Sequence, residues 1–211
     1  FTDAGGQRLD IWRRDARDWS RWRTAPALST SLQDLQFSSN GQLLSWHDGQ
    51  GRSTVWIPEA NRLFPTTGPA LLLPQGWVEA DASGAVQLRD GQGNLRRQLS
   101  GSTGWRWLFY SPAGLVVLVS SQRAEAWNLE METLRGSWEL PPLAGARLTE
   151  DGQFLMGVEV SGDVSLWSVP QGRPLGPSQP FHPQDLPHLQ LSSGHGLALA
   201  NTSAKRLELW G

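Results

Sequence analysis

The sequence predicts an all-β protein in which one small antiparallel sheet repeats about every forty residues. Two observations support this prediction. The 211 residues include 12 Trp, and several of these end the same short alternating segment. A turn that contains glycine recurs at a nearly constant distance before each such segment. Two markers that keep their separation rarely arise by chance, so they indicate an internal repeat.

The first marker is a strand-length segment of alternating apolar and polar residues. Five copies end at Trp12, Trp56, Trp127, Trp167 and Trp210, and a sixth, Val86-Gln87-Leu88-Arg89, keeps the alternation but ends in Arg. Neighbouring copies end 33 to 44 residues apart. Alternation places apolar side chains on one face of a β-strand and polar ones on the other. We therefore expect the five Trp side chains to be structural and to fill the space between neighbouring sheets.

The second marker is the turn, whose glycine is expected to adopt a positive φ. Its clearest copies end at Gly41, Gly114 and Gly152, and a looser copy ends at Gly76; the next alternating segment ends 13 to 15 residues after each. An apolar strand follows each turn, then a polar hairpin, the alternating strand and usually a weaker fourth strand. Four short antiparallel strands about every forty residues are typical of a β-propeller blade.

We interpret residues 1–211 as a single β-propeller domain with repeat units of roughly 1–30, 31–68, 69–103, 104–143, 144–186 and 187–211. The first unit keeps only its last strands, and the last unit ends after its first three. Residues 7–12 are therefore expected to add the outer strand to the last sheet, which closes a ring of about five blades. The alternative is that the chain is part of a six- or seven-bladed propeller.

One unit carries a resemblance to a known family. Its turn Leu148-Thr149-Glu150-Asp151-Gly152 leads to Ser161-Gly162-Asp163-Val164-Ser165-Leu166-Trp167. This layout resembles a WD repeat, and the unit from Phe37 to Trp56 is similar. The resemblance implies a non-catalytic scaffold that mediates protein–protein interaction, as a module of a larger protein. A carbohydrate-binding, lectin-like propeller with an aromatic pocket in each blade is the alternative, because the chain is rich in Trp.

Composition excludes several classes of function. Lys and Arg number 18 against 20 Asp and Glu, so neither nucleic acid nor an anionic membrane is expected as a partner. The chain has no Cys, which excludes a disulfide framework, a thiol nucleophile and a zinc–thiolate site. The longest apolar run, residues 115–119, has the length of a strand, so no membrane insertion is expected. The chain begins at Phe1 rather than Met, and its compartment stays open, with the cytoplasm favoured.

No catalytic residue, metal site or cofactor is predicted. The sequence has no Gly-x-Ser-x-Gly elbow, phosphate loop or His-Glu-x-x-His motif. The four His match no metal-ligand spacing. The chain is therefore not expected to be an enzyme.

Candidate partner-binding residues lie in the hairpins between second and third strands, which a propeller displays on one face. They are His47, Arg52, Asp81, Arg123, Asp163 and Lys205, together with His188 in the long loop 176–188. Trp105 and Trp107 share one face of an alternating strand and are candidates for an exposed aromatic anchor. Five Arg and two Trp interleave between Arg13 and Arg23, which we interpret as a charged outer strand rather than a nucleic-acid site.

Overall fold

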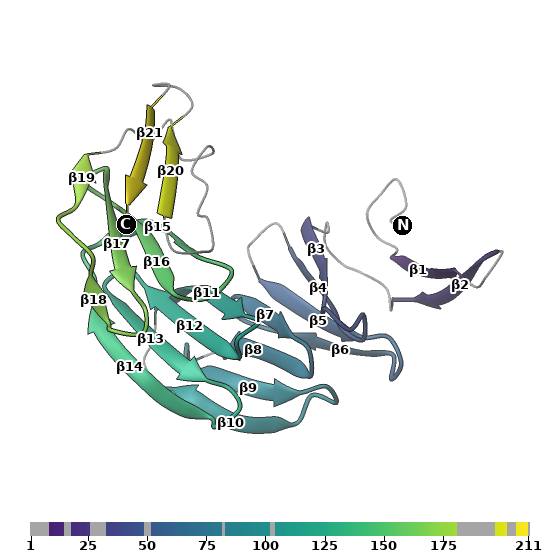
Figure 1. Ribbon diagram of the computed structural model, residues 1–211. Coiled ribbons are helices and arrows are strands. Elements are labelled where there is room, and N and C mark those ends of the chain that lie inside the picture. The colour runs from purple at the N-terminus through teal and green to yellow at the C-terminus, as the bar shows by residue number, and fades with distance from the viewer. Residues whose placement is uncertain are drawn as a thin grey trace. The chain divides into compact units, whose positions relative to one another are not determined.

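The computed structural model describes residues 9–14, 18–25, 33–48, 52–81, 83–101, 104–180, 197–201 and 206–210. All regular elements in these ranges are β-strands (Figure 1). The described residues include no helix with the length and apolar character needed to span a bilayer. The chain divides into two compact units, Phe1–Thr103 and Gly104–Gly211, which are described separately.

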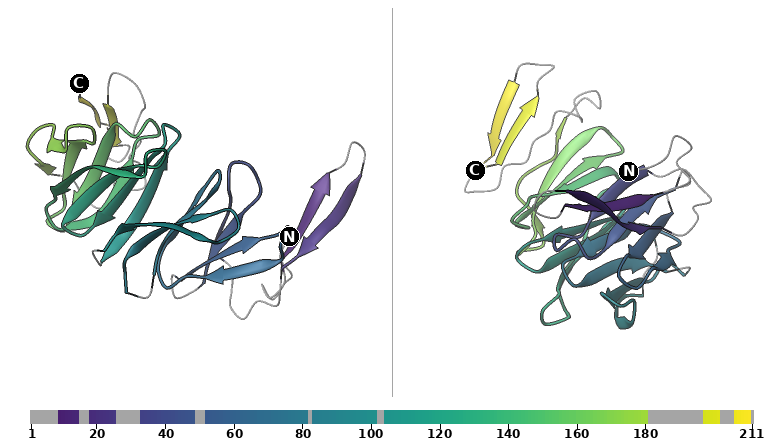
Figure 2. Two further views of the ribbon diagram at one scale, coloured as in Figure 1. Left: turned by 90° about the horizontal axis from the view of Figure 1, so that it is seen from below. Right: turned by 90° about the vertical axis from the view of Figure 1, so that its right-hand side faces the viewer.

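The described residues of the first unit form one two-stranded and two four-stranded antiparallel sheets. The two-stranded ribbon, purple in Figure 2, pairs β1 (Asp10–Arg14) with β2 (Trp19–Thr24). The next sheet has the order β3 (Gln33–Phe37), β4 (Leu44–His47), β5 (Ser53–Ile57) and β6 (Arg62–Pro65). The last has the order β7 (Ala70–Leu73), β8 (Gly76–Ala80), β9 (Val86–Asp90) and β10 (Leu95–Ser100).

The second unit repeats this arrangement. One sheet runs β11 (Trp105–Ser111), β12 (Leu115–Ser120), β13 (Arg123–Asn128) and β14 (Thr133–Glu139). The next runs β15 (Leu143–Leu148), β16 (Phe154–Glu159), β17 (Asp163–Ser168) and β18 (Arg173–Pro174), and β19 (Gln179–Pro180) also pairs with β17. A separate ribbon pairs β20 (Leu197–Asn201) with β21 (Arg206–Trp210). The expected four-stranded antiparallel sheets are thus confirmed, and their repetition is consistent with a β-propeller-like fold.

The turn glycines meet two different steric demands. Gly41, Gly114 and Gly152 have positive φ values of 70°, 77° and 73°, as expected for these turns. Gly76 does not. A Cβ atom at Gly76 would lie 1.9 Å from the carbonyl oxygen of Arg89, so the close approach of β8 and β9 requires glycine there.

Neighbouring sheets in the first unit pack a face that carries Trp against a face that carries none. Trp77, with Ala70 and Leu72 beside it, packs against Leu43, Val55 and Ile57 of the preceding sheet. The ring centroids of Phe64 and Trp77 lie 5.1 Å apart across this interface. On its other face the preceding sheet packs Leu44, Trp46 and Trp56 against Leu9 and Ala25, which adjoin the β1–β2 ribbon. The β3–β6 sheet thus buries apolar side chains on both of its faces.

The same packing recurs in the second unit. Leu155 and Trp167 of β16 and β17 share a core with Val117, Val119, Ala124 and Ala126 of the sheet before them. A Cβ atom at Gly157 would lie 2.8 Å from the Trp167 ring, so this glycine makes room for the indole. In both units, therefore, the face that carries Trp56, Trp77 or Trp167 packs against the element before it; in the second unit the surface of that preceding sheet also carries Trp107 and Trp138.

Three of the five structural Trp are buried as expected. The exposed fractions of Trp56, Trp127 and Trp167 are 0%, 8% and 4%. The prediction for Trp12 is wrong, because Trp12 is 39% exposed. The pairing of β1 with β2 shifts register between Ile11 and Trp12, and such a bulge re-aims the side chains beside it. The Trp210 side chain lies outside the described residues.

The sheet whose third strand ends in Arg89 still has a Trp face. Trp77 on β8 lies directly opposite Arg89 on β9, so the neighbouring strand supplies the indole. Side chains of directly opposite residues lie on the same face of a sheet. This arrangement explains why the Val86-Gln87-Leu88-Arg89 copy can depart from the pattern without losing its core.

The expected closing strand is not found. Residues 10–12 pair with β2 rather than with β21, and the described residues show no further strand beside the β20–β21 ribbon. The expectation that residues 7–12 complete the last sheet is therefore not confirmed, and residues 7 and 8 lie outside the described part of the chain.

Substitution of Trp167 by Ala is expected to lower the free energy of unfolding by about 3–5 kcal/mol, because it leaves a cavity between two sheets. Trp12→Ala is the matched control, with an expected loss of about 1 kcal/mol, since Trp12 is partly exposed. Urea denaturation of both variants measures the difference. Equal losses would contradict the packing described above.

Candidate functional site

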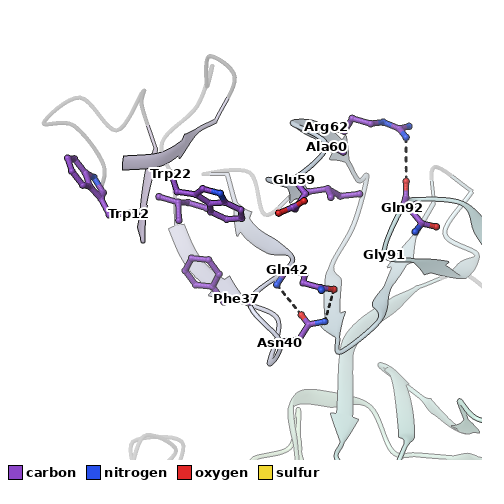
Figure 3. A pocket seen from close by; sticks show the side chains of 13 residues that line it. Trp12, Trp22, Phe37, Asn40, Gln42, Glu59, Ala60, Arg62, Gly91 and Gln92 are labelled. Carbon is purple, nitrogen blue, oxygen red and sulfur yellow. Dashed lines mark hydrogen bonds between the residues drawn. The ribbon is translucent and has the colours of Figure 1, made fainter. Parts of the chain in front are cut away.

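The first unit contains a pocket of about 680 Å³ between the β1–β2 ribbon and three turns (Figure 3). The turns join β3 to β4, β5 to β6, and β9 to β10. Trp12, Trp22 and Phe37 supply aromatic groups to its wall, and Gln42, Glu59 and Arg62 supply polar ones. We call this pocket the aromatic groove.

The aromatic side of the groove is unusually exposed for large apolar side chains. The exposed fraction is 39% for Trp12 and 53% for Phe37, and Trp22 is half-buried. Figure 3 shows Trp22 and Phe37 facing the same open space, with Glu59 and Gln42 beyond it. Aromatic side chains grouped in this way are typical of binding sites, because they bury much area with few rotatable bonds.

The groove is held in place by contacts from both sides. Arg23 of β2 donates from Nε to the carbonyl oxygen of Pro58 (3.1 Å), and its guanidinium lies 5.4 Å from the Trp22 ring centre. Arg62 lies 4.8 Å from the ring centre of Phe64 and donates to the carbonyl oxygen of Gln92 (3.4 Å). These contacts tie the ribbon to the β5–β6 turn, and that turn to the β9–β10 turn.

The turn at Asn40 is also fixed. The Oδ1 atom of Asn40 accepts hydrogen bonds from the Ser38 hydroxyl (2.7 Å) and the backbone N–H of Gln42 (3.0 Å), and its Nδ2 donates to Pro74 O. Short side chains that bond to nearby backbone are a common way to order a turn. The Asn40 bonds hold Gln42 at the edge of the groove.

The described hairpin residues proposed from the sequence lie at the opposite end of their own sheets from the first-to-second-strand and third-to-fourth-strand turns, because they belong to the second-to-third-strand hairpins. Within these hairpins they make mainly local contacts. His47 Nδ1 lies 3.0 Å from Ser53 Oγ, and Arg52 forms an ion pair with Asp48 (2.7 Å). Asp163 accepts a hydrogen bond from Ser161 (3.1 Å). His188 and Lys205 lie outside the described residues, and a partner-binding role for this face stays a prediction.

Asp81 organises the β8–β9 hairpin. Its Oδ1 accepts from the Ser83 amide (2.8 Å), the Ser83 hydroxyl (2.6 Å) and the Ala85 amide (3.1 Å), and its Oδ2 accepts from Gln87 (2.7 Å). The hydrogen bond from the Ser83 hydroxyl is the main reason that the pKa of Asp81 is lowered, and desolvation opposes it. Asp81 thus serves as the turn-ordering carboxylate of its hairpin.

Trp105 and Trp107 do not form an exposed anchor. Trp105 is only 6% exposed, and half-buried Trp107 packs against the core of its unit. The pairing of β11 with β12 shifts register between these two residues, so the simple alternation expected from the sequence does not apply.

Two buried glutamates have the chemistry of catalytic candidates, and sequence analysis did not single them out. Glu79 accepts from Trp77 Nε1 (2.7 Å) on one oxygen and from Arg89 Nε (2.5 Å) on the other. Glu125 does the same with Trp127 Nε1 (3.1 Å) and Arg123 (2.9 Å). Because both oxygens of each carboxylate are engaged, we interpret these Trp–Glu–Arg clusters as structural.

Arg123 also donates from Nε to Ser137 Oγ (2.9 Å), so this proposed hairpin residue helps to support the buried Glu125. Its guanidinium is partly exposed, with 46% of the side chain accessible to solvent. A buried carboxylate is stable as an ion only when it is paired and hydrogen-bonded. Arg123 therefore has a structural role that sequence analysis did not predict.

The described residues contain no group of three or more His, Cys, Asp or Glu placed to bind a metal ion. Comparison of the chain with protein-family models and with curated proteins found no match. The candidate site therefore rests on its own geometry. Trp22 carried a weak signal in the sequence, since it falls outside the Trp register, whereas nothing in the sequence marked Phe37 or Glu59 as neighbours of Trp22.

The stability of the chain is expected to depend on Asp81 in acid. Because the folded state lowers the pKa of Asp81, its stabilising effect is complete above the unfolded value near 3.8 and is lost as pH falls through the lower folded value. Urea midpoints of the natural chain should therefore fall further between pH 5 and pH 2 than those of Asp81→Asn, which cannot titrate there. Parallel pH profiles for the two proteins would contradict this assignment.

Proposed function

We propose that the chain is a non-catalytic scaffold, a WD-repeat-like β-propeller module of a larger protein, that binds protein partners. The aromatic groove is the observation that supports this proposal most directly. The repeated antiparallel sheets, stacked in one direction, support the propeller architecture.

The groove has the composition of a protein-recognition site. Trp, Tyr and Arg are enriched among the residues that dominate binding energy at interfaces. Here Trp12, Trp22 and Phe37 expose apolar area beside the polar groups of Glu59 and Arg62. A volume of about 680 Å³ is in the range of pockets that bind compact ligands, and so it suits a few side chains of a partner.

The groove also favours one alternative, a carbohydrate-binding module. Aromatic rings lie here together with the amides of Asn40 and Gln42 and the carboxylate of Glu59, which are groups that can hold sugar hydroxyls. A lectin with equivalent pockets in every blade is not supported, because Trp56, Trp127 and Trp167 are buried in the packing between strands. Among the described residues, a carbohydrate site would therefore be expected in this groove.

Affinity purification with Phe37→Ser and Trp22→Ala tests the proposal. Both variants should lose at least 90% of the partner proteins that the natural chain recovers, because each removes an aromatic group from the groove. Leu134→Ser is the matched control, since Leu134 is 46% exposed on β14 and lies outside the groove.

The proposal fails if the same proteins are recovered at the same level with every variant, or if no protein is recovered at all. Binding of the natural chain to a glycan array, lost in Phe37→Ser and kept in Leu134→Ser, would instead favour the carbohydrate-binding alternative.

A further inference from the structure

β3 has an open edge. In the order β3-β4-β5-β6, no described strand lies on the side of β3 that faces away from β4. The amide of Ser38, just after β3, donates to the carbonyl oxygen of Leu43 (2.9 Å). Residues of an antiparallel pair alternate between bonding to the partner strand and pointing away from it. The N–H and C=O groups of Phe37 therefore point toward the open edge.

β3 is also more exposed than the strands that hold the first position in the other sheets. Every residue from Asp34 to Phe37 is exposed, and the exposed fractions of Leu35 and Phe37 are 42% and 53%. In contrast, β7, β11 and β15 are mostly half-buried or buried. β3 thus combines an open hydrogen-bonding edge with exposed apolar side chains, which are the two features that strand addition uses.

The start of β3 carries a bulge. The pairing with β4 shifts between Gln33 and Gln36, and Asp34 has a positive φ of 50°, which is unfavourable for a residue with a Cβ atom. Bulges occur beside binding sites, where they re-aim side chains. Gln36 and Phe37 after the bulge pair regularly with Ser45 and Leu44, so this end of the edge keeps ordinary strand geometry.

One carboxylate lies on β3 itself, at Asp34, and a second, Glu59, lines the groove beside it. Asp34 and Glu59 are exposed, and the structure records no partner for either among the described residues. Arg62 also lines the groove, but its guanidinium lies over Phe64 and donates to Gln92 O. A cationic side chain on an incoming segment would complement Asp34 or Glu59.

We infer that an extended segment of a partner protein adds to β3 as a further strand of the β3–β6 sheet. Its apolar side chains occupy alternate positions, and one of them enters the aromatic groove beside Phe37 and Trp22. A Lys or Arg near one end of the segment pairs with Asp34 or Glu59. This inference rests on the proposed function, for which it supplies the mode of recognition and the chemistry of the partner.

A displayed library of linear 12-residue peptides, selected on the 211-residue chain, provides the probe. The selected peptides should alternate apolar and polar residues and include a Lys or Arg. Their affinity should be compared for Phe37→Leu and Phe37→Pro. Both variants lack the aromatic ring, but only Pro lacks the outward N–H, so Phe37→Pro should bind at least tenfold more weakly than Phe37→Leu.

A second measurement does not depend on the folding of the Pro variant. Methylation of alternate backbone nitrogens in a selected peptide should weaken binding to the natural chain at least tenfold, whereas methylation of the intervening nitrogens should not. Bound peptide should also slow hydrogen exchange at the Phe37 amide. Thermal melting of Phe37→Leu and Phe37→Pro establishes whether both variants are folded.

Four outcomes would each overturn strand addition. The first two are equal affinity for the two Phe37 variants when both are folded, and binding that backbone methylation does not change. The other two are a selected peptide that binds as a helix, and selection of no peptide at all. A peptide whose affinity falls for the Trp22→Ala variant, but does not change when its backbone nitrogens are methylated, would overturn this inference alone. The proposed function would then still hold. The proposed function would be contradicted by a separate result, namely partner proteins that bind all groove variants equally.

Discussion

The packing of a Trp-bearing face of each sheet against an apolar face of the sheet before it organises each unit of this protein. A four-stranded sheet has two faces, and in a repeat protein each face is buried by a neighbouring sheet. Trp77 packs in this way against Val55 and Ile57 in the first unit, and Trp167 packs against Val117 and Ala126 in the second, where Trp138 lies in the same core. Because the two faces differ, the contact has a direction, and the same contact can repeat along the chain.

This packing also determines where polar groups and the groove lie. The indoles of Trp77 and Trp127 bond to Glu79 and Glu125, whereas the Nε1 atoms of Trp56, Trp105 and Trp138 are buried without a partner among the described residues. An unsatisfied buried donor carries an energetic cost, which the apolar contacts of each ring must offset. The core of Leu9, Ala25 and Trp56 holds the β1–β2 ribbon on its neighbouring sheet, and that contact brings Trp12 and Trp22 to the groove.

The sequence was sufficient to predict the four-stranded sheets and the burial of Trp56, Trp127 and Trp167, because alternation and spacing are local properties of the chain. It was not sufficient where register between strands decides the outcome. The bulge at Trp12 and the cross-strand placement of Trp77 opposite Arg89 depend on which residues pair, and neither strand shows this alone. The groove was missed for a related reason, since Trp22, Phe37 and Glu59 meet only after the ribbon packs on the β3–β6 sheet.

The contact between Phe64 and Trp77 offers the most direct test of the central claim, because these rings belong to different sheets and lie 5.1 Å apart. A double-mutant cycle with Phe64→Leu and Trp77→Leu, followed by urea denaturation, measures their coupling free energy. The packing described here predicts a favourable coupling of about 0.5–1.5 kcal/mol. Strictly additive losses would contradict it, since they would mean that the two rings do not contact each other across the sheet interface.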